Sequence, residues 1–497
     1  MHRVIVIGGG ISGLASAWEI RQRCPGVEVI ILEASKDVGG CIRTERREGF
    51  VFDHGPAGFL NRHPSTLRIA RSLGLADEIV SGCEERRRRF ILSDGRLRRY
   101  PDSPSTFLGS DLLSLKAKVR MLMEPAIPRS RPRADESVGA FARRRLGKEA
   151  AELMFDPVMS GIYAGSSDRL SLRATLPQMA AVEDDRRSLL VTMLRSRGRG
   201  HRGRGASPTA LGSRRYVSFK GGMGSLVDAL KDALRDAIRP DSPVLDVARD
   251  GEHWRVMVGG DAPCELVADA VVSAAPATAA RHYLAGLDPR IDASCRAVPY
   301  APVVVVGLGF HEADVPHPLD GFGYLIPSRE RGSVLGVLWP TSIYPGYRSP
   351  DGHVLMRVVL GGERDRSICD SDTDSLMAAA RAQLNRVMGI AAKPMFGSAA
   401  RYPLGLPQYR VGHDERIEEM DRALARLPGL HVIGNAFRGI GLNTCTAVAE
   451  QTSRAIAKYL GSRHGVTTVA SDIQPIGRPL TLVSEGSNVA RRIGSSR

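Results

Sequence analysis

The chain has 497 residues, of which 43% are hydrophobic and 25% charged. This is the composition of a globular protein with room for about three domains, and it excludes a disordered chain, a collagen-like fibre and a small disulfide-bonded scaffold. Most of the net charge of +15 lies in two stretches, 186–215 with nine arginines and no acid, and 461–497 with a further +3. Such segments suit a negatively charged surface. Because no aromatic residue separates the arginines, we expect no specific nucleic-acid binding.

The seven cysteines are scattered and include no CxxC pair, so we expect neither a disulfide framework nor a metal site. This usage favours a reducing compartment, and we expect a cytoplasmic protein. The first residues lead directly into an apolar strand, Val4–Ile7, where a signal peptide would otherwise lie. The longest apolar run, Val298–Phe310, is too short to span a membrane and predicts a buried strand.

A dinucleotide-binding motif opens the chain. The strand Val4–Ile7 leads into the sequence GGGISG, then an apolar helix, a second strand and Glu33. Gly8 permits the tight turn, Gly10 lets the backbone approach a pyrophosphate, and Gly13 allows the helix to pack closely on the strand. The start of the helix presents free N–H groups to phosphate, and Glu33 is placed to accept the ribose hydroxyls.

The segment after Glu33 contains Gly39-Gly40 and then Arg43-Thr44. An acid followed by a glycine pair and Arg-Thr resembles the FAD-binding motif of the flavin amine oxidase superfamily. The resemblance implies non-covalently bound FAD, held by parts of the chain that lie far apart. A strand at Val247 is expected near the adenine. The turn and helix start near Gly441 are expected to stabilise negative charge on the reduced flavin. The expected cofactor-binding residues are Gly8, Gly10, Ser12, Gly13, Glu33, Gly39, Gly40, Arg43, Val247, Gly434, Gly441, Leu442 and Asn443.

Four further stretches, 53–75, 144–171, 321–336 and 434–445, resemble the protoporphyrinogen/coproporphyrinogen oxidase family. The similarity extends over residues 3–460 and implies the six-electron oxidation of a porphyrinogen to a porphyrin in haem biosynthesis, with O2 reoxidising the flavin. We expect protoporphyrinogen IX as the substrate and keep coproporphyrinogen III as the alternative. The sequence is also compatible with an amine oxidase, a desaturase or a non-catalytic FAD protein.

The same resemblance assigns the substrate site. Arg89 is the expected clamp for a propionate, because a guanidinium can hold a carboxylate with two hydrogen bonds. Phe322, Leu325 and Val359 are the expected apolar walls, and Gly165 is expected to let the backbone approach the macrocycle. We predict no catalytic side chain, since flavin N5 accepts the hydride and the cofactor supplies the redox chemistry.

The expected fold class is α/β, with a discontinuous Rossmann-type FAD-binding domain formed by 1–80, 216–295 and 411–460. A mainly helical region, 81–215, a mixed-sheet substrate region, 296–410, and a disordered basic tail, 461–497, complete the chain. Within the substrate region we expect strands at Val303–Gly309, Val334–Leu338 and Val354–Leu360. Apolar residues recur with helical spacing at Leu108, Leu112, Leu115, Val119 and Leu122. This stripe and the basic loop suggest a peripheral protein on the cytoplasmic face of a membrane. A second copy of the chain and ferrochelatase are considered as further partners.

Overall fold

The computed structural model describes residues 2–128, 135–186, 188–192, 215–464 and 466–467. A five-stranded parallel sheet has the order β10-β2-β1-β14-β20, and its strands come from three distant parts of the chain. Because helices or strands cover both faces, its strands are continuous apolar runs, as the sequence predicts. In sheet order the strands are Ile238–Arg239, Glu28–Leu32, Arg3–Ile7, Ala270–Ser273 and Leu430–Val432.

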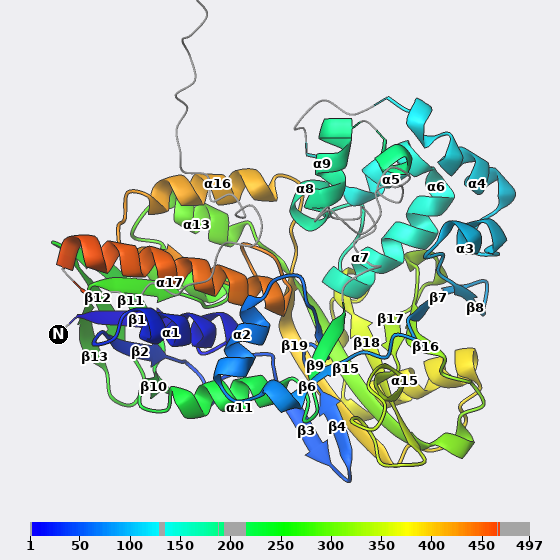
Figure 1. Cartoon of the computed structure of the whole chain (residues 1–497), viewed down its shortest axis with the longest axis horizontal. Helices are drawn as coiled ribbons and strands as arrows, with labels where there is room; N and C mark the ends of the chain where they lie inside the picture. Colours follow the sequence, from blue (N-terminus) through cyan, green and yellow to red (C-terminus); the bar gives the residue numbers. More distant parts are fainter. Residues whose placement is uncertain (1, 129–134, 187, 193–214, 465, 468–497) are drawn as a thin grey trace, which may run out of the picture.

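Three helices cover one face of this sheet (Figure 1): α1 (Ile11–Arg23), α11 (Gly224–Ala233) and α17 (Leu442–His464). The other face packs against the antiparallel sheet of β11 (Val244–Asp250), β12 (His253–Val258) and β13 (Cys264–Ala268). It also packs against the helices α12 (Ala277–Leu284), α13 (Pro289–Arg296) and α16 (His413–Leu424). Since α1 and α17 lie side by side, the first and last described helices form one layer over the dinucleotide motif.

A second, mixed sheet has seven strands in the order β19-β15-β18-β17-β16-β7-β8. All pairs are antiparallel except the parallel pair of β16 and β7. One face packs on α15 (Thr373–Met388) through a closed apolar core. In sheet order the strands are Phe396–Pro407, Tyr300–His311, His353–Gly361, Val334–Leu338, Gly321–Leu325, Arg88–Ser93 and Arg96–Arg99. The predicted strands near 303–309, 334–338 and 354–360 are confirmed.

The expectation of a mainly helical region from residue 81 onward is wrong at its start. Residues 88–99 form β7 and β8, which complete the seven-stranded sheet. The described helices of this region begin with α3 (Pro104–Gly109) and α4 (Leu115–Leu122), so the predicted stripe from Leu108 to Leu122 is two helices rather than one. The region continues with α5 (Val138–Leu146), α7 (Asp156–Tyr163), α8 (Leu172–Thr175) and α9 (Pro177–Arg186).

The expected boundary of a disordered tail at residue 461 is also wrong, because α17 continues to His464. The remainder of that tail, 468–497, and the centre of the predicted basic loop, 193–214, lie outside the described residues. In the part of the chain that the structure describes, no helix is both long and apolar enough to cross a membrane.

Candidate functional site

The dinucleotide loop between β1 and α1 has the shape of a phosphate cradle. Gly8 has a φ of +103°, which favours glycine, and a Cβ on Gly13 would lie 1.9 Å from the Gly8 carbonyl oxygen. A Cβ on Gly10, in contrast, would meet nothing within 4 Å. Open space beside Gly10 at the start of a helix is where a pyrophosphate would lie, so these residues fit the group that the motif predicts.

Glu33 at the end of β2 is held next to this loop. Its Oε2 accepts a hydrogen bond from Gly9 N at 2.6 Å, and its Oε1 accepts one from Ser35 N at 2.8 Å. Gly39 follows with a φ of +110°, and its N–H donates to the Gly9 carbonyl at 2.8 Å. The predicted acid and glycine pair therefore lie against the loop of Gly8–Gly13, which is the arrangement expected for an adenosine ribose and diphosphate.

The other predicted cofactor residues lie in several different elements. Val247 is 2% exposed and packs in the core, but its strand β11 lies at the edge of its sheet, which leaves main-chain groups for an adenine. Gly434 follows β20 with a φ of +119°, and Leu442 begins α17 next to Gly441. Ser12 of α1 contacts the Cys445 thiol of α17. Arg43 is exposed.

The side chain of Asn443 has a role that the sequence did not indicate. Its Oδ1 accepts hydrogen bonds from Arg62 N at 3.1 Å and His63 N at 2.6 Å, and its Nδ2 donates to His63 O and Thr66 Oγ1. Two acceptor contacts and two donor contacts use the full capacity of the amide. The side chain therefore fixes the 62–66 segment to the start of α17, and its main chain is the part available to a cofactor.

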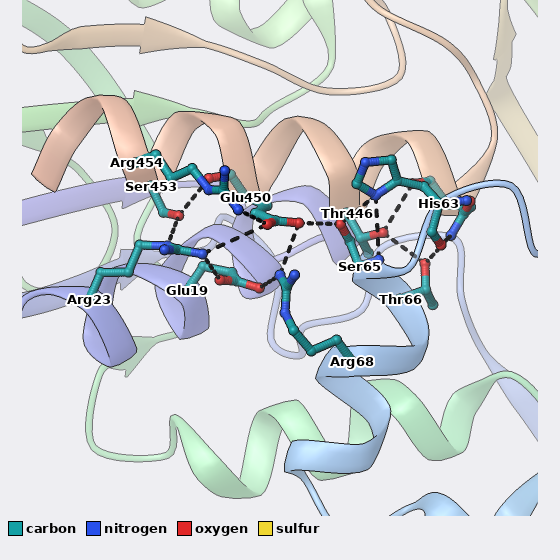
Figure 2. A network of polar contacts seen from close by, with 11 residues as sticks. Glu19, Arg23, His63, Ser65, Thr66, Arg68, Thr446, Glu450, Ser453 and Arg454 are labelled. Atoms are coloured by element: carbon teal, nitrogen blue, oxygen red, sulfur yellow. Dashed lines mark hydrogen bonds and ion pairs between the residues drawn. The ribbon is translucent and has the colours of Figure 1, made fainter. Parts of the chain in front are cut away.

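A buried polar network continues from this point along α17 (Figure 2). Glu450, 5% exposed, accepts a hydrogen bond from Ser65 and forms ion pairs with Arg68, at 3.0 Å, and Arg454. Glu19 of α1 pairs with Arg68 and Arg23. The hydrogen bonds to Glu450 hold the pKa of its carboxyl below the ordinary value against the effect of burial. The network joins α1, α2 (Ser65–Ser72) and α17, the helices beside the predicted flavin site.

We call Arg89, Phe322, Leu325, Leu338, Arg357 and Val359 the inner face of the seven-stranded sheet; all six are half-buried. Their neighbours along the strands, such as Tyr324, Val337 and Val358, belong to the opposite core against α15. The guanidinium of Arg89 lies over the Phe322 ring, 5.5 Å from its centroid. Burial lowers the pKa of Arg89, since a desolvated cation is less stable.

A β-bulge brings Phe322 and Leu325 to this one face. Residues three apart on a regular strand point to opposite faces. Here the pairing with β7 shifts between Gly321 and Gly323, and Gly323 has a φ of +130°. Phe322 packs with Tyr216, while Leu325 packs against α7. The structure therefore brings together Arg89, Phe322, Leu325 and Val359 as predicted neighbours on one surface.

Two glycines lie near the inner face. Gly165 follows Ala164, which packs in the same apolar cluster as Val359. A Cβ on Gly165 would be 2.2 Å from Gln408 Oε1, so this buried glycine makes room for Gln408. Gly161, one turn earlier in α7, is exposed and would place a Cβ 2.6 Å from Leu325.

Two further residues were missed from sequence. Cys41 lies between Gly55 and β19, because a Cβ on Gly55 would be 2.0 Å from the Cys41 carbonyl oxygen and Tyr402 Oη donates to that oxygen at 3.4 Å. Burial raises the pKa of its thiol. Arg357 faces the same side as Val359, two residues along β18. A signal was present in the sequence, since Arg357 is the one charged residue in the otherwise apolar run Val354–Leu360.

Comparisons with known proteins agree with this geometry. The family model described as "Flavin containing amine oxidoreductase" matches residues 11–457. The chain is 32% identical to a coproporphyrinogen III oxidase of Bacillus subtilis over 89% of this chain and 95% of that relative. It is 28% identical to protoporphyrinogen oxidase 2 of Arabidopsis thaliana, over 93% of this chain and 94% of that relative. A cyclohexylamine oxidase structure from Brevibacterium oxydans shares the fold, with a TM-score of 0.66 at 18% identity over 92% of this chain and 99% of that chain.

Proposed function

Because the chain belongs to the flavin-containing amine oxidoreductase family, we propose that it is an FAD-dependent porphyrinogen oxidase of haem biosynthesis, with coproporphyrinogen III as its substrate. The observation that carries this proposal is the inner face, where the desolvated Arg89 lies over the Phe322 ring on a surface shared with Leu325 and Val359. An apolar macrocycle with carboxylate arms fits such a surface. Coproporphyrinogen III is chosen over protoporphyrinogen IX because the relative named for it is the more similar one.

Bound FAD would accept the electrons and hydrogen removed from the substrate and transfer them to O2. The residues of the chain bind and orient the substrate and the flavin. Arg89 holds a carboxylate arm, and Phe322, Leu325 and Val359 form an apolar wall that keeps water from the macrocycle. The positive end of α17 and the N–H groups near Leu442 favour negative charge at the flavin. An electron-rich substrate needs no strong side-chain base for this reaction.

Peripheral contact with a membrane is part of the proposal. Five large apolar side chains are exposed on α3, α4 and the residue after α4: Leu108, Leu115, Val119, Leu122 and Met123, with exposed fractions of 49–78%. Basic residues lie among them at 116, 118 and 120. An apolar patch with flanking cations is typical of a helix that lies on an anionic membrane surface.

The test is porphyrin fluorescence during aerobic incubation of the flavin-loaded protein with coproporphyrinogen III and, separately, with protoporphyrinogen IX. We expect coproporphyrin emission to rise much faster than autoxidation alone produces. Protoporphyrin emission from the second substrate should rise more slowly. A faster rise with protoporphyrinogen IX would correct the choice of substrate. No rise with either compound would reject porphyrinogen oxidation.

A further inference from the structure

The strand register places two arginines at the ends of one row of residues across the seven-stranded sheet. Arg357 of β18 lies opposite Leu338 of β17, Leu338 lies opposite Gly323 of β16, and Gly323 lies opposite Arg89 of β7. Three steps between strands, each about 4.8 Å, separate the Cα atoms of the two arginines by about 14 Å. Both guanidinium groups belong to the inner face, with Leu338 and Phe322 between them.

The guanidinium of Arg357 is held in place but not neutralised. Its Nη2 donates to the Gly55 carbonyl at 2.5 Å, and its Nε lies 3.4 Å from the Asp53 carbonyl. No carboxylate among the described residues lies within ion-pair distance of Arg357. Its hydrogen bonds to the described residues involve Nε and Nη2 and not Nη1. Burial lowers the pKa of this arginine. A half-buried cation with a free N–H edge is suited to an anionic ligand.

Arg357 is also the last open position of its row. The next residue across the sheet is Gly307 of β15, where a Cβ would lie 2.7 Å from the Phe52 ring. Phe52 therefore closes the row on this side. Tyr216 lies within electrostatic range of both Arg357 and Arg89, and its ring centroid is 5.9 Å from that of Phe322. The row is thus an apolar and aromatic surface with one cation at each end.

We propose that Arg357 is a second carboxylate anchor of the substrate site, opposite Arg89, and that this pair selects a porphyrinogen with carboxylates on opposite edges. The inference rests on the proposed function and deepens it. Coproporphyrinogen III carries a propionate on each pyrrole, so both arginines have a partner. Protoporphyrinogen IX carries propionates on two adjacent pyrroles and vinyl groups on the other two. It therefore leaves one arginine facing an apolar edge, which costs binding free energy.

The test compares Arg357→Gln with Arg357→Lys in the flavin-loaded protein. The glutamine keeps an amide donor for the carbonyls of residues 53 and 55 but carries no charge, whereas lysine keeps the charge. The dissociation constants of coproporphyrin III, its tetramethyl ester and protoporphyrin IX are measured by fluorescence titration. We expect Arg357→Gln to weaken coproporphyrin III binding about 10- to 100-fold, and the other two less than about threefold. Arg357→Lys should restore part of the loss.

Arg401→Gln is the matched control, because Arg401 of β19 lies opposite Val304, a residue of the α15 core, and donates to the Ser371 carbonyl away from the inner face. Equal weakening of all three ligands by Arg357→Gln would assign Arg357 a purely structural role and overturn the inference. So would unchanged coproporphyrin III binding in a protein that still turns over coproporphyrinogen III, and the proposed function would then stand. A wild-type protein that oxidises neither porphyrinogen would instead remove the proposed function, and the inference with it.

Discussion

The open space beside Gly10 has a direct consequence for cofactor binding. Because a Cβ at this position meets nothing in the protein, Gly10→Val should fold normally and place its methyl groups where the pyrophosphate approaches. We expect purified Gly10→Val to contain almost no flavin, measured as flavin absorbance per mole of protein. Gly286→Val is the control, since Gly286 is exposed and its Cβ position is also free. Full flavin content in Gly10→Val would contradict the placement of the phosphates.

Arg89 permits a test of the carboxylate clamp itself. Arg89→Ala removes a desolvated cation beside Phe322 and should raise KM for coproporphyrinogen III at least tenfold, in line with about 2–5 kcal/mol for a buried charge pair, with flavin content unchanged. Steady-state kinetics with Arg88→Ala provide the comparison, because Arg88 is 49% exposed and pairs with Asp320 at the surface. An unaltered KM in Arg89→Ala would place Arg89 outside the substrate site.

Among the elements, α17 depends on the network around Glu450. Glu450→Gln removes one of the two carboxylates that pair with the half-buried Arg68, and breaking a buried ion pair costs at most about 3–5 kcal/mol. We expect a corresponding decrease in the free energy of unfolding, measured with urea. Glu418→Gln on the exposed side of α16 (His413–Leu424) should leave it unchanged. If both variants unfold at the wild-type urea concentration, the network does not stabilise the helix layer.

The exposed patch on α4 is tested with vesicles. Leu115→Glu combined with Val119→Glu adds two negative charges to side chains that are 78% and 49% exposed. Flotation with anionic phospholipid vesicles should recover the wild type and lose most of this variant, because apolar insertion and charge attraction are both weakened. Met257→Glu, an exposed apolar position on β12, serves as the control. Equal recovery of all three proteins would contradict membrane contact through α4.

Local sequence patterns predicted the elements that are apolar along their whole length. Val334–Leu338 was predicted residue for residue, and the glycine motif was placed correctly, because burial on both faces imposes an apolar run. The strand at Arg88–Ser93 was missed although it forms a local hairpin with β8, since both strands contain several arginines, which obscure the apolar pattern. Arg357 and the bulge at Gly323 depend on the register between distant strands, which single-strand patterns do not encode.

For the whole molecule, stability should decrease on mild acidification. His413 is 3% exposed, and burial lowers its pKa to about 4. Burial lowers the pKa of His431 to about 4 as well. Between that value and the unfolded value of 6.5, the unfolded chain binds more protons, so stability falls as the pH falls, by about 1.4 kcal/mol per pH unit for His413. We expect the melting temperature to drop from pH 6.5 to 4. His413→Gln should make the melting temperature depend less on pH. A pH dependence identical to that of the wild type would contradict the contribution assigned to His413.

The layer formed by α1 and α17 also constrains when the protein can be completed during its synthesis. The loop that would hold the pyrophosphate leaves the ribosome long before α17, the helix that packs against α1. The strand β7 likewise waits for β16 before it has a neighbour on that side. Contacts between such distant segments close slowly and expose unpaired strand edges to aggregation. We therefore expect flavin to bind after α17 has been made, and overproduction of the protein to yield flavin-free, aggregation-prone material.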